Sequence, residues 1–338
     1  MKLKFAFAGF RHGHIYGLYE WARTSPEAEI VAAAEDNEAT RKSLAGAGKV
    51  TLTHASVRKM LDEVKCDVVA VGDYYGARGG IEIMALERGR HVISDKPLCT
   101  DLAELDRIES LSRSKGLKVG MMLDMRDRGN MAGLRKLVHD GVLGPIHAVF
   151  FGGQHPLMLG SRPGWYFEPG KHGGTINDIA IHAFDAIPWI TGMSFHSIVA
   201  ARCWNAFAPQ VPHFKDGGQL MMTLSNGAGV MGDVSYFAPD SMGYTFPLYW
   251  RITLWGRNGV AEVCSKNEGV SVGLNGEKEM RVVQTPANDP NGYARAFAAD
   301  VAGKPIPGAL DTPTVLRASR VALMAQRAAD QGQTHVKL

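Results

Sequence analysis

One stretch of the sequence places an imidazole among carboxylates at helical spacing. Asp178, His182 and Asp185 stand at i, i+4 and i+7, and apolar residues occupy the opposite side at about 100° per residue. A histidine side chain, with an unperturbed pKa of about 6.5, can act as a general acid or base near neutral pH. The pattern predicts that Asp178 fixes the tautomer of His182 and favours its protonated form. A solvated polar face or a shared divalent-ion site would produce the same spacing, so both alternatives stay open.

A lysine in another segment could assist the same chemistry. Lys96 lies in the sequence Asp95-Lys96-Pro97, directly after an apolar strand expected at 90–94. Ligands of open α/β sheets bind outside the carboxyl ends of the strands, and the proline keeps Lys96 out of helical geometry. Lys96 could therefore stabilise negative charge that develops on a reacting oxygen. An ordinary loop would contain the same tripeptide.

A turn that could hold a dinucleotide follows the first expected strand, at 2–8. It consists of Gly9, Phe10, Arg11, His12, Gly13 and His14 and opens a helix expected at 14–23. Such turns hold a pyrophosphate on backbone N–H groups at the positive end of the helix. Of the fingerprint G-x-G-x-x-G only Gly9 is kept, because Arg11 and His14 occupy the other two positions. A plain strand-to-helix turn is the alternative.

Two acids end the second expected strand, at 30–34. A carboxylate in this position accepts hydrogen bonds from both ribose hydroxyls and repels a 2′-phosphate, so we expect NAD rather than NADP. Glu35 is the preferred ribose ligand because it follows the strand directly, and Asp36 is a second candidate for binding the cofactor. The alternative is an acidic N-cap for the next helix, which would then be Asp36. We expect five further residues to line the cofactor cleft: Gly72, Asp73, Tyr74, Asp95 and Lys96.

The elements that position these residues change character along the chain. Up to residue 123, strands alternate with helices, which predicts βαβ units and a doubly wound parallel sheet. After residue 146 the chain contains one expected helix, at 177–191, followed by strand after strand with Asn-Gly turns. This predicts an α+β domain with a large, mostly antiparallel sheet. The expected domains are 1–123 for dinucleotide binding, 124–312 for substrate binding and oligomerisation, and 313–338 as a helix and tail packed on the body.

Composition excludes several classes of protein. The 37 basic residues against 34 acidic ones give a net charge of +3, too small to indicate nucleic acid or an anionic membrane as the main partner. No apolar run is long enough for a spanning helix, and no signal peptide is expected. The four cysteines are scattered, which is typical of reduced thiols in a cytoplasmic protein.

Taken together, these segments resemble the Gfo/Idh/MocA oxidoreductases, which include glucose–fructose oxidoreductase and inositol dehydrogenases. Residues 89–98 are similar to the family's Glu-Lys-Pro segment, with Asp95 in place of Glu, and residues 173–185 are similar to its glycine run with Asp-x-x-x-His. Residues 30–41 resemble its second strand and ribose-binding acid. Residues 72–78 depart from the family's Pro-Asn turn, which marks a divergent subgroup.

The resemblance implies an N-terminal Rossmann domain followed by an α/β domain with a large open sheet. It also implies an NAD(P)-dependent oxidoreductase that transfers hydride between the nicotinamide and a secondary alcohol of a sugar, inositol, related polyol or sugar acid. Lys96, Asp178 and His182 would be the catalytic residues, converging on one crevice and also contacting substrate. Association into a homodimer or homotetramer through the sheet of the C-terminal domain is implied as well.

Further substrate contacts are expected from loops around the catalytic helix. Aromatic side chains flanked by cations suit a polyhydroxylated or carboxylated ligand. The candidates are Asp124, Arg126, His155, Arg162, Trp165, Lys171 and His172. Each could equally be a structural surface residue.

Three other functions compete with net hydride transfer. A redox-neutral, NAD-dependent glycoside hydrolase or lyase on the same scaffold would need nearly the same residues. A non-catalytic sugar-sensing protein would have no need of an acid–base pair beside Lys96. A metal-dependent hydrolase is a third alternative, although no further ligand cluster stands out and no metal is expected.

Overall fold

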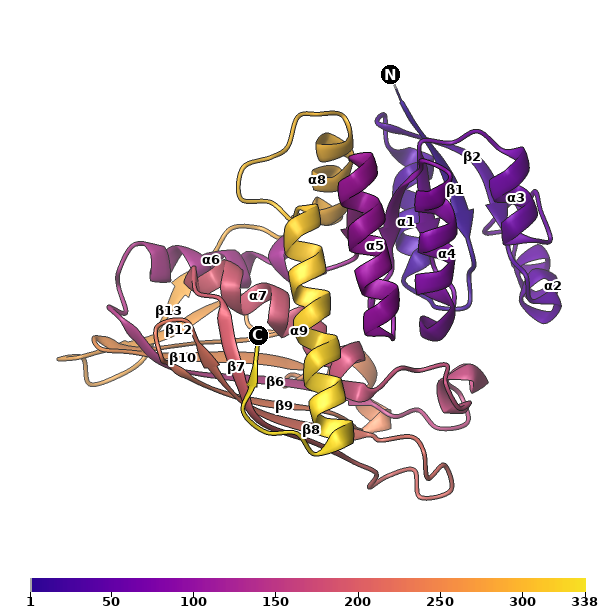
Figure 1. The fold of residues 1–338 in the computed structure, drawn as a ribbon. Helices are drawn as coiled ribbons and strands as arrows, with labels where there is room; N and C mark the ends of the chain where they lie inside the picture. Colours follow the sequence, from indigo (N-terminus) through magenta and orange to yellow (C-terminus); the bar gives the residue numbers. More distant parts are fainter. Residues whose placement is uncertain (1) are drawn as a thin grey trace. The chain divides into compact units, whose positions relative to one another are not determined.

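The computed structural model describes residues 2–338, which fold as two compact units (Figure 1). The first unit contains the chain up to Met122, together with 170–173 and 291–319. The second contains Leu123–Pro169, Gly174–Pro290 and Arg320–Leu338. No helix within residues 2–338 has the length and apolar character needed to cross a membrane.

The first unit is built on a five-stranded parallel sheet in the order β2-β1-β3-β4-β5. Its strands are β1 (Leu3–Ala8), β2 (Ala28–Ala34), β3 (Val68–Val71), β4 (His91–Ser94) and β5 (Val119–Met121). Strand β3 is apolar and buried along its whole length, and β1 and β4 are buried beyond their first two and first residues, as expected for parallel strands covered by helices. The prediction of a doubly wound parallel sheet is confirmed.

Seven helices contribute to the first unit. They are α1 (Ile15–Thr24), α2 (Glu38–Ala47), α3 (Val57–Glu63), α4 (Tyr75–Glu87), α5 (Leu102–Lys115), α8 (Gly292–Val301) and the part of α9 (Thr312–Gln331) up to Ser319. The N-cap of α2 is Asn37, whose side chain accepts from the N–H of Thr40. The alternative that Asp36 caps this helix was therefore wrong, because the helix begins one residue later.

The second unit is built on a nine-stranded sheet in the order β13-β12-β11-β10-β6-β9-β8-β7-β14. Its strands are β6 (Ile146–Pro156), β7 (Phe195–Trp204), β8 (Gly217–Leu224), β9 (Gly229–Ala238), β10 (Trp250–Gly256), β11 (Gly259–Cys264), β12 (Gly269–Leu274), β13 (Arg281–Gln284) and β14 (Val336–Lys337). Every pairing is antiparallel except that of β6 with β9. The prediction of a mostly antiparallel sheet is confirmed.

The second unit also contains helical segments. They are η1 (Asp124–Asp127), α6 (Gly129–His139), η2 (Gly164–Phe167), the π-helical turn η3 (Ile176–Ala180), α7 (Ile181–Thr191), η4 (Asp240–Thr245) and α9 from Arg320 onward. Figure 1 shows α6 and α7 lying along the sheet. The sequence did not predict α6. This helix begins at Gly129, where only glycine fits, because a Cβ there would lie 1.8 Å from the carbonyl oxygen of Pro286.

The division into units differs from the domain boundaries expected from the sequence. Residues 291–319 were expected in the substrate domain and the tail, whereas their contacts group them with the first unit. Phe297 of α8 packs against Gly120 of β5, where a Cβ would lie 2.5 Å from its ring, and the hydroxyl of Thr312 accepts from the N–H of Val119 at 2.9 Å. The late helices thus complete the first unit.

Candidate active site

The segment of the second unit that is expected to be catalytic begins with a π-helical turn. Residues Ile176–Ala180 form η3, and α7 follows directly. The side-chain oxygen of Gln326 accepts from the N–H groups of Ile176 and Asn177 at 2.9 and 3.3 Å. Gly174 has φ +98°, and a Cβ there would lie 2.1 Å from Cδ of Gln326, so the amide of α9 fits only against glycine. π-Helical turns are frequent at functional sites because they change which residues face one another.

The polar residues of this segment are buried. Asp178, His182 and Asp185 are 1%, 6% and 1% exposed, so the alternative of a solvated polar face is wrong. Tyr236 of β9 donates its hydroxyl to Asp178, and Arg126 donates from Nε and Nη2 to the two oxygens of Asp185 at 2.9 and 2.6 Å. Buried carboxylates need such partners, so Arg126, expected to bind substrate, is engaged in orienting α7.

His182 lies between a carboxylate and an indole. Its Nδ1 is 3.9 Å from Oδ1 of Asp124, and its ring centre is 5.5 Å from that of Trp250. Asp124 is exposed, and its other oxygen accepts from Nη2 of Arg128 at 3.2 Å. A buried imidazole within reach of an accessible carboxylate is suited to general acid–base catalysis. That Asp178 orients His182 stays a prediction.

An aromatic wall stands next to His182. The ring of His155 lies 4.8 Å from Tyr249, 5.9 Å from Tyr236 and 6.4 Å from Trp250. Burial, together with the Asp178 carboxylate, raises the pKa of Tyr236 well above its usual value, so Tyr236 remains a hydroxyl donor. The sequence missed Tyr236 and Tyr249 because they come from a strand and a loop that carry no local motif.

Two further residues expected to bind substrate support this wall. Arg162 donates to the carbonyls of Pro156 and Leu157, and its guanidinium lies 5.1 Å from the ring centre of Tyr236. Trp165 is 6% exposed and stacks on Tyr166 with the ring centres 4.1 Å apart. The structure places both residues in the packing around the site, and their contact with substrate stays a prediction.

In the first unit, Lys96 is held in a buried loop. It is 2% exposed, and its Nζ lies 6.0 Å from the ring centre of Tyr75. Arg78, which has no exposed surface, donates to the carbonyls of Asp73 and Pro97 and to Oδ2 of Asp95. Arg78 therefore ties together the two loops that follow β3 and β4 and fixes the segment that carries Lys96.

The turn at 9–14 fits a dinucleotide in part. Gly9 has φ +83°, and a Cβ there would lie 2.7 Å from Cβ of Asp73, so glycine is required. The N-terminus of α1 has no capping side chain and no acid in its first turn, which leaves it suited to a phosphate. Arg11 points its Nε at Oδ1 of Asp73, 2.6 Å away, and its guanidinium lies 4.5 Å from the ring centre of Tyr74.

Glu35 is fully buried and connects this turn to β2. Its two oxygens accept from the N–H groups of Phe10 and Asn37, each at 2.7 Å, and burial raises its pKa. Asp36 is exposed, and one of its oxygens accepts from the N–H of Val57. Asp36 is therefore the accessible carboxylate here, and the expected ribose contact of Glu35 stays a prediction.

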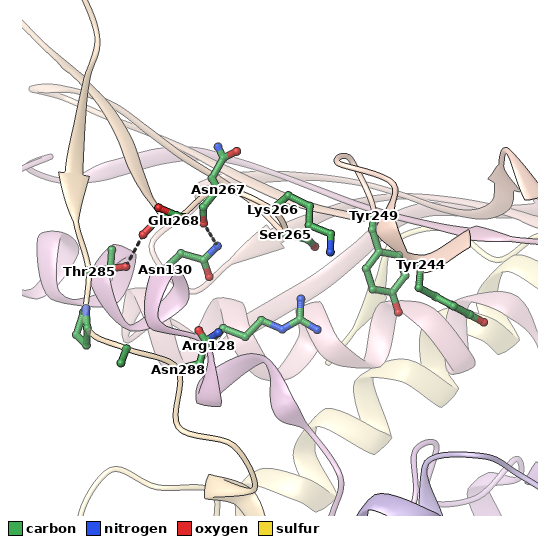
Figure 2. Close-up of a pocket in the computed structure, with 12 residues that line it drawn as sticks. Arg128, Asn130, Tyr244, Tyr249, Ser265, Lys266, Asn267, Glu268, Thr285 and Asn288 are labelled. Atoms are coloured by element: carbon green, nitrogen blue, oxygen red, sulfur yellow. Dashed lines mark hydrogen bonds between the residues drawn. The ribbon is translucent and has the colours of Figure 1, made fainter. Parts of the chain in front are cut away.

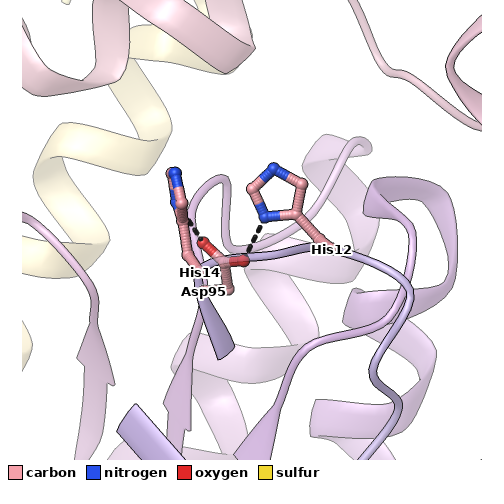
Figure 3. Close-up of side chains that lie close together, drawn as sticks. All are labelled: His12, His14 and Asp95. Atoms are coloured by element: carbon pink, nitrogen blue, oxygen red, sulfur yellow. Dashed lines mark hydrogen bonds and ion pairs between the residues drawn. The ribbon is translucent and has the colours of Figure 1, made fainter. Parts of the chain in front are cut away.

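Two histidines of the turn converge on Asp95 (Figure 3). His12 Nδ1 bonds to Oδ2 of Asp95, His14 Nδ1 lies 3.2 Å from Oδ1, and the hydroxyl of Tyr75 is 3.1 Å from His12 Nε2. These two imidazole nitrogens and one carboxylate oxygen are ligands that a transition metal could accept. Arg78, 3.2 Å from the same carboxylate, already balances its charge, so we assign the group to holding Asp95 in place.

His12 makes stability depend on pH. Burial lowers its pKa to about 4, although contact with Asp95 acts in the opposite direction. Since the unfolded pKa is about 6.5, the stabilisation is fully present above pH 6.5 and is lost as the pH falls toward 4. We expect the wild type to lose about 2 kcal/mol more than His12→Gln between pH 7 and pH 5 in urea unfolding. The exposed His147→Gln should behave as the wild type, and equal losses in all three proteins would contradict the prediction.

Lys171 and His172, which are expected to contact substrate, lie in the first unit, and that contact stays a prediction. Lys171 Nζ lies 5.1 Å from the ring centre of Tyr74, and the His172 ring lies 5.5 Å from that of Tyr75. Both therefore accompany the residues expected to bind the cofactor. Lys96 lies in the first unit and Asp178 and His182 in the second, so their convergence stays a prediction.

Known proteins resemble the chain over most of its length. D-glucoside 3-dehydrogenase of Escherichia coli is 25% identical over 306 residues, covering 84% of this chain and 83% of that protein. Levoglucosan dehydrogenase of Pseudarthrobacter phenanthrenivorans is 25% identical over 182 residues, covering 52% and 45%. The chain spans less than half the length of two of the curated relatives it matches, 46% and 45%. An inositol dehydrogenase homologue from Azotobacter vinelandii, solved with NAD+, has the same fold, with TM-score 0.81, 18% identity and coverage of 100% and 98%.

Two family models match the two parts of the fold. Residues 3–123 match the oxidoreductase family with an NAD-binding Rossmann fold, and residues 131–262 match the C-terminal domain of the same family. The first match contains the parallel sheet and Lys96, and the second contains Asp178 and His182. The chain belongs to the Gfo/Idh/MocA oxidoreductase family.

Proposed function

We propose that this protein is an NAD-dependent dehydrogenase that oxidises a secondary alcohol of a sugar or related polyol. The observation that carries the proposal is the buried imidazole of His182, which lies near an exposed carboxylate and against an aromatic wall. Aromatic faces with hydroxyl and charged donors are suited to sugar rings. The names of two relatives, levoglucosan dehydrogenase and D-glucoside 3-dehydrogenase, support this substrate class.

The residues of the first unit support NAD as the cofactor. The uncapped N-terminus of α1 would receive the pyrophosphate, with Arg11 close by, and the carboxylates of Glu35 and Asp36 disfavour a 2′-phosphate. When bound, NAD supplies the hydride acceptor. NADP is the less favoured alternative.

Each catalytic side chain has one task in the proposed reaction. His182 accepts the proton of the substrate hydroxyl as hydride leaves the carbinol carbon. Asp124 and Asp178 stabilise the imidazolium, and Tyr236 holds Asp178 in place through its hydroxyl. Lys96 donates a hydrogen bond to the reacting oxygen and stabilises its developing negative charge.

Assembly through the open face of the nine-stranded sheet is part of the proposal. Met221 of β8 and Met231 of β9 are paired in register and are 46% and 53% exposed. Their neighbours in sequence, Met222 and Val230, are buried on the opposite, helix-covered face. An exposed apolar patch of this kind favours a homodimer or homotetramer. The four free cysteines support a reducing, cytoplasmic location.

A cofactor and substrate screen tests the proposed function. The purified protein is incubated with NAD or NADP and a panel of sugars, inositols and sugar acids. Formation of the reduced cofactor is followed by its absorbance at about 340 nm. We expect reduction of NAD with at least one sugar and a weaker response with NADP. Cleavage of a glycoside without net absorbance change would replace the proposal with redox-neutral chemistry, and sugar binding without either reaction would indicate a sensor.

A further inference from the structure

The second unit contains a polar cavity of about 520 Å³ (Figure 2). It is lined where α6 begins, along the turn between β11 and β12, after β13, and by the loop before β10. The lining residues that matter here are Arg128, Asn130, Tyr244, Tyr249, Lys266 and Glu268. This volume lies in the range of about 300–1,000 Å³ that small-molecule sites occupy. We refer to it as the Asn130 cavity.

Asn130 lines this cavity and carries a buried acceptor that has no hydrogen-bond partner among the described residues. It is 6% exposed, and its Nδ2 donates to the carbonyls of Cys264 and Asn267 at 3.0 and 3.1 Å. Both partners are carbonyl oxygens, which only accept hydrogen bonds, so the side-chain atom that faces them must be the amide nitrogen. The remaining side-chain atom of Asn130 is therefore the acceptor Oδ1. Among the described residues Oδ1 has no hydrogen-bond partner, although it is buried. Figure 2 shows this oxygen directed away from Asn267, on the side of Arg128.

The side chains that line the Asn130 cavity determine which kind of ligand it suits. A buried acceptor without a partner is unfavourable, so a ligand that donates to Oδ1 gains from binding there. A carboxylate or phosphate has no proton to donate, whereas a hydroxyl both donates and accepts. Arg128 and Lys266 supply donors, Glu268 supplies an acceptor, and the tyrosine rings supply apolar faces. This combination fits a polyhydroxylated ring.

The walls of the cavity are held in place by contacts within the chain. Asn288 accepts from the N–H of Gly129 at 2.9 Å, and the hydroxyl of Thr285 donates to the carbonyl of Glu268 at 2.9 Å. A site formed before its ligand arrives binds with less loss of conformational freedom.

The Asn130 cavity adjoins the residues around His182. The ring of Tyr249, which lines the cavity, lies 4.8 Å from that of His155. Arg128, which also lines it, pairs with Asp124, whose other oxygen is 3.9 Å from His182 Nδ1. We propose that this cavity is a subsite for a second sugar unit, so the substrate is a glycoside whose second ring donates a hydroxyl to Asn130. The inference rests on the proposed function for the position of the reacting ring.

Kinetics with matched sugars test the subsite. Wild type, Asn130→Ala and Lys266→Ala are compared on glucose, methyl glucoside, maltose and cellobiose. We expect at least one disaccharide to have a kcat/KM about tenfold or more above that of glucose. Each variant should lower kcat/KM for that disaccharide about 2- to 10-fold more than for glucose, since one hydrogen bond is lost. Lys278→Ala, an exposed lysine outside the cavity, should change neither.

The outcomes separate the subsite from the proposed function. Equal losses on glucose and disaccharide, or no preference for a disaccharide, would overturn the subsite while leaving the dehydrogenase in place. Since Asn130→Ala removes two hydrogen bonds to the backbone, its melting temperature is measured, and the exposed Lys266→Ala provides a variant that should fold normally. If no sugar reduces NAD, the proposed function fails, and saturation-transfer NMR with maltose decides the subsite: binding weakened by both variants supports it, and absent or unchanged binding overturns it.

Discussion

We expect replacement of His182 with alanine to lower kcat for sugar oxidation by about 10²- to 10⁴-fold, the usual contribution of a general base. The affinity for NAD, measured by calorimetry, stays within a few-fold of wild type, because His182 belongs to the second unit and the family's NAD-binding domain comprises residues 3–123. Wild-type kcat itself falls at low pH, where a protonated imidazole cannot accept the substrate proton, so the difference between wild type and variant is smallest there.

Two further variants serve as controls for this prediction. His182→Gln keeps most of the side-chain volume and should be as inactive as His182→Ala, which separates lost chemistry from lost packing. His147→Gln, on an exposed position of β6, should retain wild-type kcat. Turnover of His182→Ala within tenfold of wild type would show that another group accepts the proton.

We expect Lys96→Met to lower kcat by about 10²- to 10³-fold, as removal of a single donor to a developing oxyanion does in other enzymes. Methionine preserves the apolar stem against Tyr75 and removes only the charge, so the fold of the buried loop should persist. NAD affinity should change by less than about tenfold. Stopped-flow measurement of the hydride-transfer step and titration of NAD distinguish the two effects.

Lys118→Met is the matched control for this variant. Lys118 lies in the same unit, beside β5, and its Nζ pairs with Asp300 at 2.8 Å, so it tests the loss of a lysine charge without the proposed role. We expect its kcat to be unchanged. If Lys96→Met instead weakens NAD binding as much as it lowers kcat, Lys96 is a cofactor ligand and not the donor to the reacting oxygen.

Much of the fold follows from local patterns, and the exceptions have physical causes. The alternation of strands and helices before residue 123 and the Asn-Gly turns after 225 predict both sheets, because periodicity and turn chemistry are local signals. The helices α6 and α8 were missed. The glycine that opens α6 is unfavourable within a helix but is required by the backbone of Pro286, a contact between residues 157 positions apart that a local pattern cannot reveal.

The candidate site shows the same limit. Lys96, Asp178 and His182 were found because each lies in a motif, whereas Tyr236, Tyr249 and Asn130 come from segments without one. The partner of Asp185 illustrates the difficulty. Arg126 is expected from the sequence to bind substrate, but the fold brings it to Asp185, 59 residues later in the chain, where it holds α7 in place. The burial of Asp178, His182 and Asp185 likewise depends on tertiary packing. Their spacing in the sequence does not show whether they face solvent or the interior.

The hydrogen bonds of Gln326 to Ile176 and Asn177 have a consequence for synthesis of the protein. The π-helical turn that carries Asp178 receives these bonds from a side chain made 150 and 149 residues later. While the ribosome is still translating the segments in between, the nascent chain contains Asp178 and His182 but lacks the amide that completes their scaffold. The hydrogen bonds of this turn therefore become complete only after helix α9 has left the exit tunnel.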